Sequence, residues 1–452
     1  MASRKEKNKL HFWGIANAGE GFISIISSTY MSIFLTDVAL LPLGMVSAVM
    51  LVTSTADFIL ALTAGAIIVA TRPMKWGKLR SWLLVCPPIT ALFSIIQFLS
   101  FPEKPLLSAI IISIGFIIAK ATWNLSYTAN LSLINVMAQT PKERSDLNAQ
   151  RMVGSNLGRL TGNYLTPLIT ATLAATISER TLYPLIMVAV GIFFILANLA
   201  HFKMSRSYEA APSDKLAIDT LSIKEIIITL TTNPQLLVTV LIDLTSNMAG
   251  LTMPALAVYY YRYVAEAPLM VSTHMLLTGI AGLCGALSVR LFGKYVKDFK
   301  RALCYAYLII AAALFSIRFI GHNMYAFLAS NILMHFLTGT TQPFEIGLYM
   351  DNVTYIKWKT GKDANSLIVG LSNIPVKFAG IFRSFLIPFA LASAGYVAGA
   401  EPTPALKQAI INTFSTIPVL IPLLGYTMLR FAYKLSTEKV EQMKKEIEQR
   451  KI

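Results

Sequence analysis

The sequence predicts an all-α membrane protein with twelve transmembrane helices in two six-helix halves, and three observations support this. First, the 452-residue chain is 55% hydrophobic and only 14% charged, whereas soluble proteins average about 25% charged residues. Second, apolar stretches of about 20 residues, the length that crosses a hydrocarbon core, recur along it. Third, Lys and Arg gather in alternate connections. Too little charge remains to cover soluble domains.

The apolar stretches number twelve, and several are longer than the minimum and contain Gly, Pro, Ser or Thr. This mixture suits tilted helices around a polar cavity better than helices that face only lipid. The predicted spans are 10–36, 44–70, 81–101, 106–138, 152–178, 182–202, 236–262, 268–292, 302–320, 322–350, 366–396 and 405–433.

Most of the 39 Lys and Arg residues fall on one side of this arrangement, in the N-terminal segment, alternate connections and the C-terminal tail. By the positive-inside bias both termini are cytoplasmic, and the even number of spans agrees. We expect a multi-pass protein of the cytoplasmic (inner) membrane of a prokaryote. The net charge of +16 then reflects topology, and no nucleic-acid partner is expected.

Neither a leader sequence nor cysteine chemistry is expected. The first apolar run is too long for a cleavable signal peptide and has no small-residue cleavage site. Cys86, Cys284 and Cys304 have neither metal nor disulfide spacing, so we expect them to be packing residues.

The chain divides into two similar halves, residues 1–202 and 236–433, joined by a central loop, 203–235, with an amphipathic LSIKEIIITL. WGKLRSWLLVC after the second span and FGKYVKDFKRALCY after the eighth indicate a duplication. Six plus six spans with a central loop is the pattern of the major facilitator fold. The charged tail 434–452 is expected to be a solvated helix.

Nine charged residues fall inside the predicted spans. One such charge facing lipid at the bilayer centre costs about 3 kcal/mol on insertion scales. We therefore expect them to face each other or a water-filled cavity; the alternative is fixed ion pairs that hold helices in register. Arg318, near a predicted helix end, is also able to snorkel. The nine are Glu20, Asp57, Asp243, Glu345, Lys120, Arg159, Arg318, Lys377 and Arg383.

YIKWKTGKDANSLIVG, residues 355–370, resembles the tenth-to-eleventh loop of the glycoside–pentoside–hexuronide:cation symporters, the family of melibiose permease. The first three spans, with TDV, a mid-helix aspartate and the TR…WGK…W turn, are similar to the same family. TPKERSDLNAQR and VKFAGIFRSFLIPFALASAGYVAG also resemble it, so the likeness covers both halves. It implies the major facilitator fold and no enzymatic activity.

The resemblance implies a coupling-cation site on the second span, where the family has two carboxylates one turn apart. Asp57 matches the first, but Ala61 stands at the second. Fewer charged ligands favour H⁺ over Na⁺, since a lone carboxylate at low dielectric takes up a proton more readily. Ser54 and Thr55 offer hydroxyl oxygens, so Na⁺ at Asp57 stays open. Lys377 matches the family's eleventh-span lysine and is the expected partner of Asp57.

The substrate residues carry over only partly. Arg151 matches a family arginine at the substrate cavity, and Glu20 lies beside the position of a sugar-binding carboxylate. The fourth span reads WNLSYTANLSLIN, which supplies the aromatic faces and polar groups that sugars require; ordinary interhelical packing is the alternative. Melibiose itself is not expected, and cations at Lys377, Arg383 and Arg151 suit an anionic glycoside. The expected substrate residues are Glu20, Trp123, Asn124, Ser126, Tyr127, Asn130, Arg151, Asn373 and Lys377.

We therefore predict a secondary active transporter: a monomer that couples H⁺ or Na⁺ to uptake of a sugar, glycoside or uronide by alternating access, with no cofactor. The alternative is a major-facilitator carrier of a non-sugar solute, such as a lipid, an organic anion or a drug, because fold alone does not decide the solute. A membrane enzyme is disfavoured, since no HExxH, GxSxG or Walker motif occurs.

Overall fold

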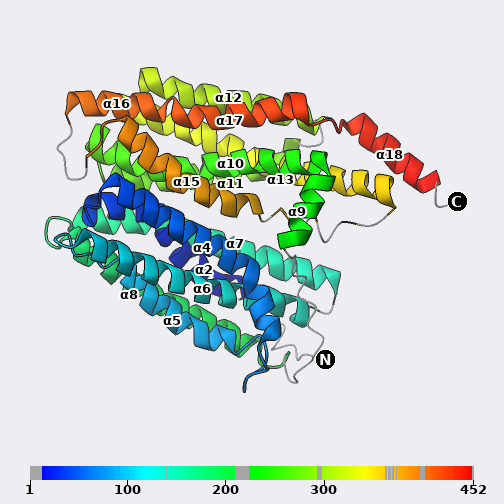
Figure 1. Cartoon of the computed structure of the whole chain (residues 1–452), viewed down its shortest axis with the longest axis horizontal. Coiled ribbons are helices and arrows are strands. Elements are labelled where there is room, and N and C mark those ends of the chain that lie inside the picture. The colour runs from blue at the N-terminus through cyan, green and yellow to red at the C-terminus, as the bar shows by residue number, and fades with distance from the viewer. Residues whose placement is uncertain are drawn as a thin grey trace. The chain divides into compact units, whose positions relative to one another are not determined.

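The computed structural model describes residues 13–138, 140–208, 223–292, 298–361, 364, 368, 371–372, 374–397 and 403–449, and in these ranges it consists of helices and connections without a strand. The chain forms two compact units (Figure 1). Unit 1 comprises Met1–Thr220 with Val271–Thr273, and unit 2 comprises Leu221–Met270 with His274–Ile452. The prediction of an all-α protein is confirmed.

Unit 1 is a bundle of long helices in which the first is broken. Segments Ala16–Thr29 and Met31–Val38 meet at an angle of 42°. Thr140 begins a later helix as its N-cap, accepting from the Glu143 N–H at 3.2 Å, an arrangement that satisfies a free backbone donor. The helices are α2 (Trp13–Thr29), α3 (Met31–Ile33), the π-helix η1 (Phe34–Val38), α4 (Leu43–Ala70), α5 (Trp82–Ile96), α6 (Pro105–Met137), α7 (Pro141–Leu173) and α8 (Glu179–Met204).

Glycines bring α2 and α7 into direct backbone contact. A Cβ atom on Gly154 would lie 1.5 Å from the carbonyl oxygen of Gly14, and one on Gly158 would lie 1.9 Å from that of Ala18. Small residues four apart let membrane helices approach closely, since lipid gives helices no hydrophobic reason to associate. This contact sets polar side chains of α2 beside those of α7.

Unit 2 contains the remaining helices, and several of them also carry internal prolines or end in a π-helix. Gly361, with φ of 73°, ends the longest helix in the left-handed conformation that glycine adopts readily. The helices are α9 (Ile223–Thr232), α10 (Pro234–Tyr259), η2 (Tyr260–Val264), α11 (Met270–Phe292), α12 (Phe299–Ile320), α13 (Met324–Thr360), α15 (Ile374–Ser393), α16 (Pro404–Phe414), α17 (Ile417–Thr427), η4 (Met428–Ala432) and α18 (Thr437–Gln449).

Each of the twelve predicted spans coincides with a helix or a broken helix. Among the described residues, eight helices are long and apolar enough to cross a bilayer, or nine with the bent first pair. The other three predicted spans correspond to α5, which has only 15 residues, and to α7 and α13, which carry more polar side chains. Polar membrane helices are typical of those that face protein or a cavity.

The connecting segment and the tail were predicted less well. Helix α9 forms where the amphipathic stretch was expected, while residues 209–222 lie outside the described part, so the domain boundaries stay a prediction. The tail helix α18 is not simply solvated: Val440 is buried, and the Trp358 indole N–H donates to Glu446 at 2.6 Å. Packing against α13 was invisible in the tail's charged composition. Cys284 is exposed, so its assignment as a packing residue was wrong.

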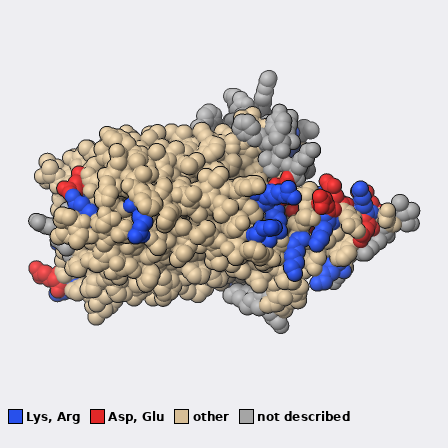
Figure 2. All heavy atoms as spheres, turned by 90° about the horizontal axis from the view of Figure 1, so that it is seen from above, with Lys and Arg blue, Asp and Glu red and all other residues tan. Residues whose placement is uncertain are grey.

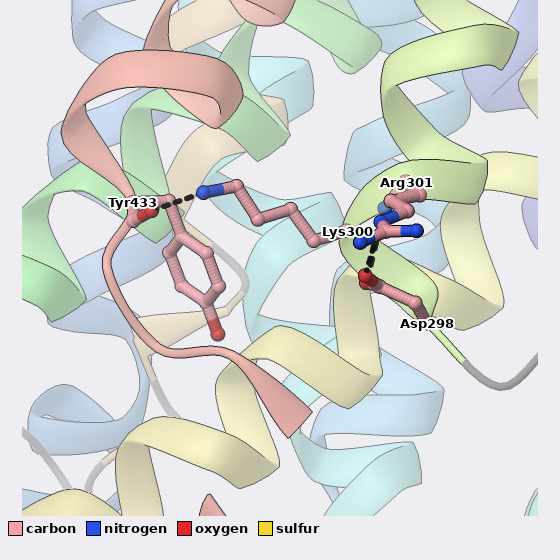
Figure 3. A network of polar contacts seen from close by, with 4 residues as sticks. All are labelled: Asp298, Lys300, Arg301 and Tyr433. Atoms are coloured by element: carbon pink, nitrogen blue, oxygen red, sulfur yellow. Dashed lines mark hydrogen bonds and ion pairs between the residues drawn. The ribbon is translucent and has the colours of Figure 1, made fainter. Parts of the chain in front are cut away.

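The tail continues a polar network at one end of unit 2 (Figure 3). The Lys300 ammonium donates to the Tyr433 carbonyl at 2.7 Å, and Arg301 pairs with Asp298 at 3.1 Å. The Tyr433 hydroxyl in turn donates to Asp351 at 3.3 Å. These contacts join the start of α12, the end of α13 and the segment before α18.

Asp351, beyond the predicted tenth span, makes the stability of this end depend on pH. Burial raises its pKa to about 6, although the Tyr433 hydroxyl and the Lys444 ammonium oppose the rise. The folded protein therefore binds this proton more readily than the unfolded chain, and stability should increase as pH falls from 7 toward 4. We expect Asp351→Asn to raise the melting temperature at pH 7.5 by about 2 °C, discounted for partial exposure.

Thermal unfolding of wild type and Asp351→Asn at pH 7.5 and pH 4.5 measures this effect. The gain should vanish at pH 4.5, where the wild-type carboxyl is already protonated. The exposed Asp146 of α7 provides the control, since Asp146→Asn should change neither value. An equal gain for Asp351→Asn at both pH values would contradict the assignment.

Candidate functional site

The mid-helix aspartate of α4 lies against α6. The Asn124 side-chain amide donates to Asp57 Oδ1 at 2.9 Å and to the Lys120 carbonyl at 2.9 Å. Asn124 is buried, while Asp57 is half-buried. The second bond fixes the amide so that an N–H faces the carboxylate. The structure thus brings together two of the residues expected at the site.

Aromatic rings continue the site along the same face of α6. Trp123 and Tyr127 stack with ring centroids 4.8 Å apart, as their i, i+4 spacing allows. The Lys120 ammonium lies 5.3 Å from the Trp123 ring, and the Arg151 guanidinium carbon of α7 lies 4.5 Å from the Tyr127 ring. Cations over ring faces are attracted by the ring quadrupole. The result is an aromatic surface with a cation at each end.

Glu20 of α2 begins a polar chain that runs through the interior of unit 1. The Asn17 side-chain amide donates to Glu20 Oε2 at 3.1 Å and to the side-chain oxygen Oδ1 of Asn130 at 3.3 Å. Asn130 contacts His201 Nδ1 at 2.9 Å, and His201 Nε2 contacts the Trp13 carbonyl at 2.9 Å. This series of hydrogen bonds therefore orients the Glu20 carboxylate through Asn17.

Two arginines of α7, Arg151 and Arg159, also act electrostatically on the Glu20 carboxylate. Arg151 is half-buried and Arg159 is exposed. Glu20 Oε1 and Arg151 Nε are buried and have no hydrogen-bond partner among the described residues. Nearly all buried polar atoms in proteins have a partner, so these two atoms keep hydrogen-bonding capacity for water or for a ligand.

The remaining first-half predictions have mixed outcomes. Ser126 is buried and donates to the Trp123 carbonyl at 3.1 Å, which supports packing rather than direct ligand contact. Asn130 is likewise part of the hydrogen-bonded series that runs from Glu20 to Trp13. Ser54 and Thr55 are half-buried on α4, in the turn before Asp57, and Ala61 lies one turn beyond it. No group of three or more His, Cys, Asp or Glu side chains suited to a metal occurs among the described residues.

Second-half predictions fall on α15. Lys377 is half-buried there. Arg383 lies further along the same helix, with a buried Nε that has no hydrogen-bond partner in the described chain. Asn373 and most of the 362–370 loop lie outside the described residues. The pairing of Asp57 with Lys377 stays a prediction.

Arg318, by contrast, is exposed in the last turn of α12, consistent with the snorkelling alternative.

Unit 2 also contains a carboxylate pair to which no sequence motif assigned a role. Asp243 of α10 accepts from the Asn247 amide at 2.7 Å and the Tyr349 hydroxyl at 2.9 Å. Glu345 of α13 accepts from the Tyr307 hydroxyl at 2.9 Å. Both carboxylates are buried, and hydroxyl and amide donors surround them. The tyrosines were missed because they lie on other helices or a turn away, with no local signal.

Polar partners of Glu20 were missed in the same way. The His201 ring packs against Trp13 at a tilt of 40°, with centroids 4.2 Å apart, although they are far apart in the chain. Asn17 was detectable, since it lies three residues before Glu20 on the same helical face.

Comparison with known proteins places this arrangement in a family. A family model described as MFS/sugar transport protein matches residues 12–437. The chain belongs to this family. Its all-helical structure is also similar to a bacterial homologue of the human lysosomal transporter Spinster in an inward-facing, unoccupied conformation, with a TM-score of 0.70, 11% identity and coverage of 96% of this chain and 98% of that one.

Curated relatives agree with the family. The uncharacterised symporter YjmB of Bacillus subtilis is 25% identical, over 99% of this chain and 96% of that protein. A protein of Escherichia coli named as a putative sulfoquinovose importer is 24% identical, over 97% of this chain and 93% of its own length. The chain is therefore a multi-pass membrane transporter of the sugar-symporter class and not an enzyme, as predicted.

Proposed function

We propose that this transporter imports an anionic sugar derivative, such as a sulfonated sugar or a uronide, together with a proton. Its aromatic surface at Trp123 and Tyr127 receives the apolar C–H face of the sugar ring. Arg151 and Arg159 attract the anionic substituent, and Glu20 accepts hydroxyl hydrogens.

The observation that carries the proposal is the pair of buried, unsatisfied atoms, Glu20 Oε1 and Arg151 Nε, beside the stacked rings. An acceptor and a donor close to an aromatic face match a ring with hydroxyls and an acidic group. Around this surface Lys120, Arg151 and Arg159 outnumber Glu20 and Asp57, which favours an anionic over a neutral substrate. The relative named as a sulfoquinovose importer agrees, since sulfoquinovose carries a sulfonate.

Proton coupling is proposed for Asp57. Hard cations such as Na⁺ prefer several oxygen ligands, but Asn124 presents an N–H to this carboxylate and residue 61 is alanine. A single carboxylate with few further oxygen ligands is better suited to a proton than to Na⁺. Proton binding would loosen Asp57 from its cationic partner, for which Lys377 remains the candidate, and so raise sugar affinity. By thermodynamic linkage the sugar raises proton affinity by the same factor.

The proposed setting is the inner membrane of a prokaryote. Both termini lie in the cytoplasm, the functional unit is a monomer, and transport proceeds by alternating access. The charge distribution among the connections supports this orientation.

Uptake into proteoliposomes tests the function. Sulfoquinovose, glucuronic acid and glucose would be supplied with a pH gradient or a Na⁺ gradient, while external pH is followed. We expect one of the anionic sugars to be accumulated with external alkalinisation and glucose to be transported at least about tenfold more slowly, since the cations at the site outnumber its carboxylates and the neutral sugar cannot compensate them. Transport of glucose alone would contradict the anionic assignment, and no response to any sugar would favour an organic-anion carrier.

Ala61→Asp tests the cation assignment directly. A second carboxylate one turn from Asp57 places two on the same helical face and supplies a further ligand for Na⁺. We expect uptake to become Na⁺-stimulated, by about tenfold, and the sugar-induced pH change to shrink. Ala61→Asn, which has similar size without the charge, should stay proton-coupled. Sodium stimulation of the wild type equal to that of Ala61→Asp would contradict proton coupling.

A further inference from the structure

An apolar groove runs along the outside of unit 2 between α12 and α17, which pack against each other. Its volume is about 420 Å³. Among its lining side chains are Leu308, Ala311 and Phe315 of α12 and Val419, Leu420 and Leu423 of α17. The hydroxyl of Thr416, which also lines it, donates to the Asn412 carbonyl at 2.7 Å. The hydroxyl hydrogen of Thr416 is therefore already used, and the other side chains named here are apolar.

Helical spacing connects this groove to exposed arginines at one end. Arg301 lies seven residues before Leu308 on α12, so it occupies roughly the same helix face as the groove, and Arg430 lies in η4, which directly continues α17. Lys300 and Arg430 both act electrostatically on the Cys304 thiol of α12, which places Arg430 beside the start of that helix. The two arginines thus flank the end of the groove.

The positive charges at this end are compensated only in part. Arg301 pairs with Asp298, and the Lys300 ammonium donates to the Tyr433 carbonyl (Figure 3). Arg430 is exposed and has no ion pair among the described residues. Seen from the side of α12 and α17, the middle of this surface is uncharged. Lys and Arg, with Asp and Glu among them, gather toward the end near the C-terminal helix, and a few charged residues lie at the opposite end (Figure 2).

We propose that this surface binds an anionic phospholipid of the cytoplasmic leaflet. One acyl chain lies in the groove, and the phosphate group lies between Arg430 and the Lys300–Arg301 turn. Both features are needed: an apolar groove alone accepts any acyl chain, whereas basic residues at the end of membrane helices select anionic head groups. The positive-inside bias assigns this basic end to the cytoplasmic leaflet.

Native mass spectrometry of the purified transporter tests the proposal with two probes that share acyl chains, dioleoyl phosphatidylglycerol and dioleoyl phosphatidylcholine. We expect the wild type to retain phosphatidylglycerol about tenfold better. Arg430→Gln should remove most of this preference while leaving phosphatidylcholine retention unchanged. Arg180→Gln, at an exposed arginine of unit 1, is the control and should keep the preference.

Filling the groove gives a second, independent test. Leu420→Trp, at a side chain 62% exposed, should lower retention of both lipids, whereas Leu287→Trp on α11, at one 65% exposed, should not. Both lie on the surface, so folding should survive, and equal melting temperatures in detergent would verify it. Equal retention of the two lipids by the wild type would overturn the proposal. Variants that behave like their controls would also overturn it. A wild-type dimer that Leu420→Trp dissociates would overturn it too, because it would assign the groove to a second copy of the chain.

Discussion

Asp57→Asn is expected to abolish concentrative transport. Asparagine keeps the shape of the side chain but neither carries a charge nor exchanges a proton, so the driving cation is uncoupled from the sugar. We expect accumulation against a gradient to fall about 100-fold, the upper end of usual coupling factors. Sugar-induced alkalinisation outside proteoliposomes should disappear at the same time.

Binding distinguishes lost coupling from a damaged protein. The aromatic surface at Trp123 and Tyr127 is intact in Asp57→Asn, so sugar affinity should change by less than about tenfold, and exchange of labelled for unlabelled sugar should persist. Asp37→Asn provides the control: it neutralises another carboxylate of unit 1, one that accepts from the Thr36 hydroxyl at 2.6 Å. Unchanged alkalinisation in Asp57→Asn would rule out Asp57 as the coupling group.

Arg151→Gln is expected to have the second large effect, on substrate affinity. It removes the guanidinium over the Tyr127 ring and leaves Glu20 buried with one electrostatic partner fewer. Losing a cation that acts on a buried carboxylate leaves that carboxylate less compensated, and an anionic ligand loses a charged donor at the same position. We expect the affinity for an anionic sugar to fall about 100-fold, measured by isothermal titration calorimetry on the purified protein.

Two further variants test why arginine is needed. Arg151→Lys keeps the charge but loses the planar fork and ring stacking, so it should recover affinity only in part, to about tenfold below the wild type. Arg318→Gln, at the exposed arginine of α12, should bind as the wild type does. Equal losses of affinity for anionic and neutral sugars in Arg151→Gln would mean that Arg151 supports the fold of the site rather than the anion.

Local features were predictable because helices are built from local contacts. A span must supply about 20 apolar residues for the bilayer, so α4, α6 and α8 were found at nearly their observed bounds. Within a helix, the i, i+4 spacing of Trp123 and Tyr127 is enough to place both rings on one face. Asp57 stood out because a carboxylate at that depth is costly without a function or partner.

The sequence by itself determined the class of protein, its helices and the chemical types of its site residues, because bilayer thickness and helical hydrogen bonding act over short stretches of chain. Only the tertiary structure decided which of these residues meet. Arg151 of α7 acts electrostatically on Glu20 of α2 because glycines at 14, 154 and 158 allow the two helices to touch, and Asn124 rather than a second carboxylate contacts Asp57. Glu20 and Arg151 are more than a hundred residues apart in the sequence, and Asp57 and Asn124 are 67 residues apart. Both arrangements depend on packing between distant segments, and no local pattern in the sequence records them.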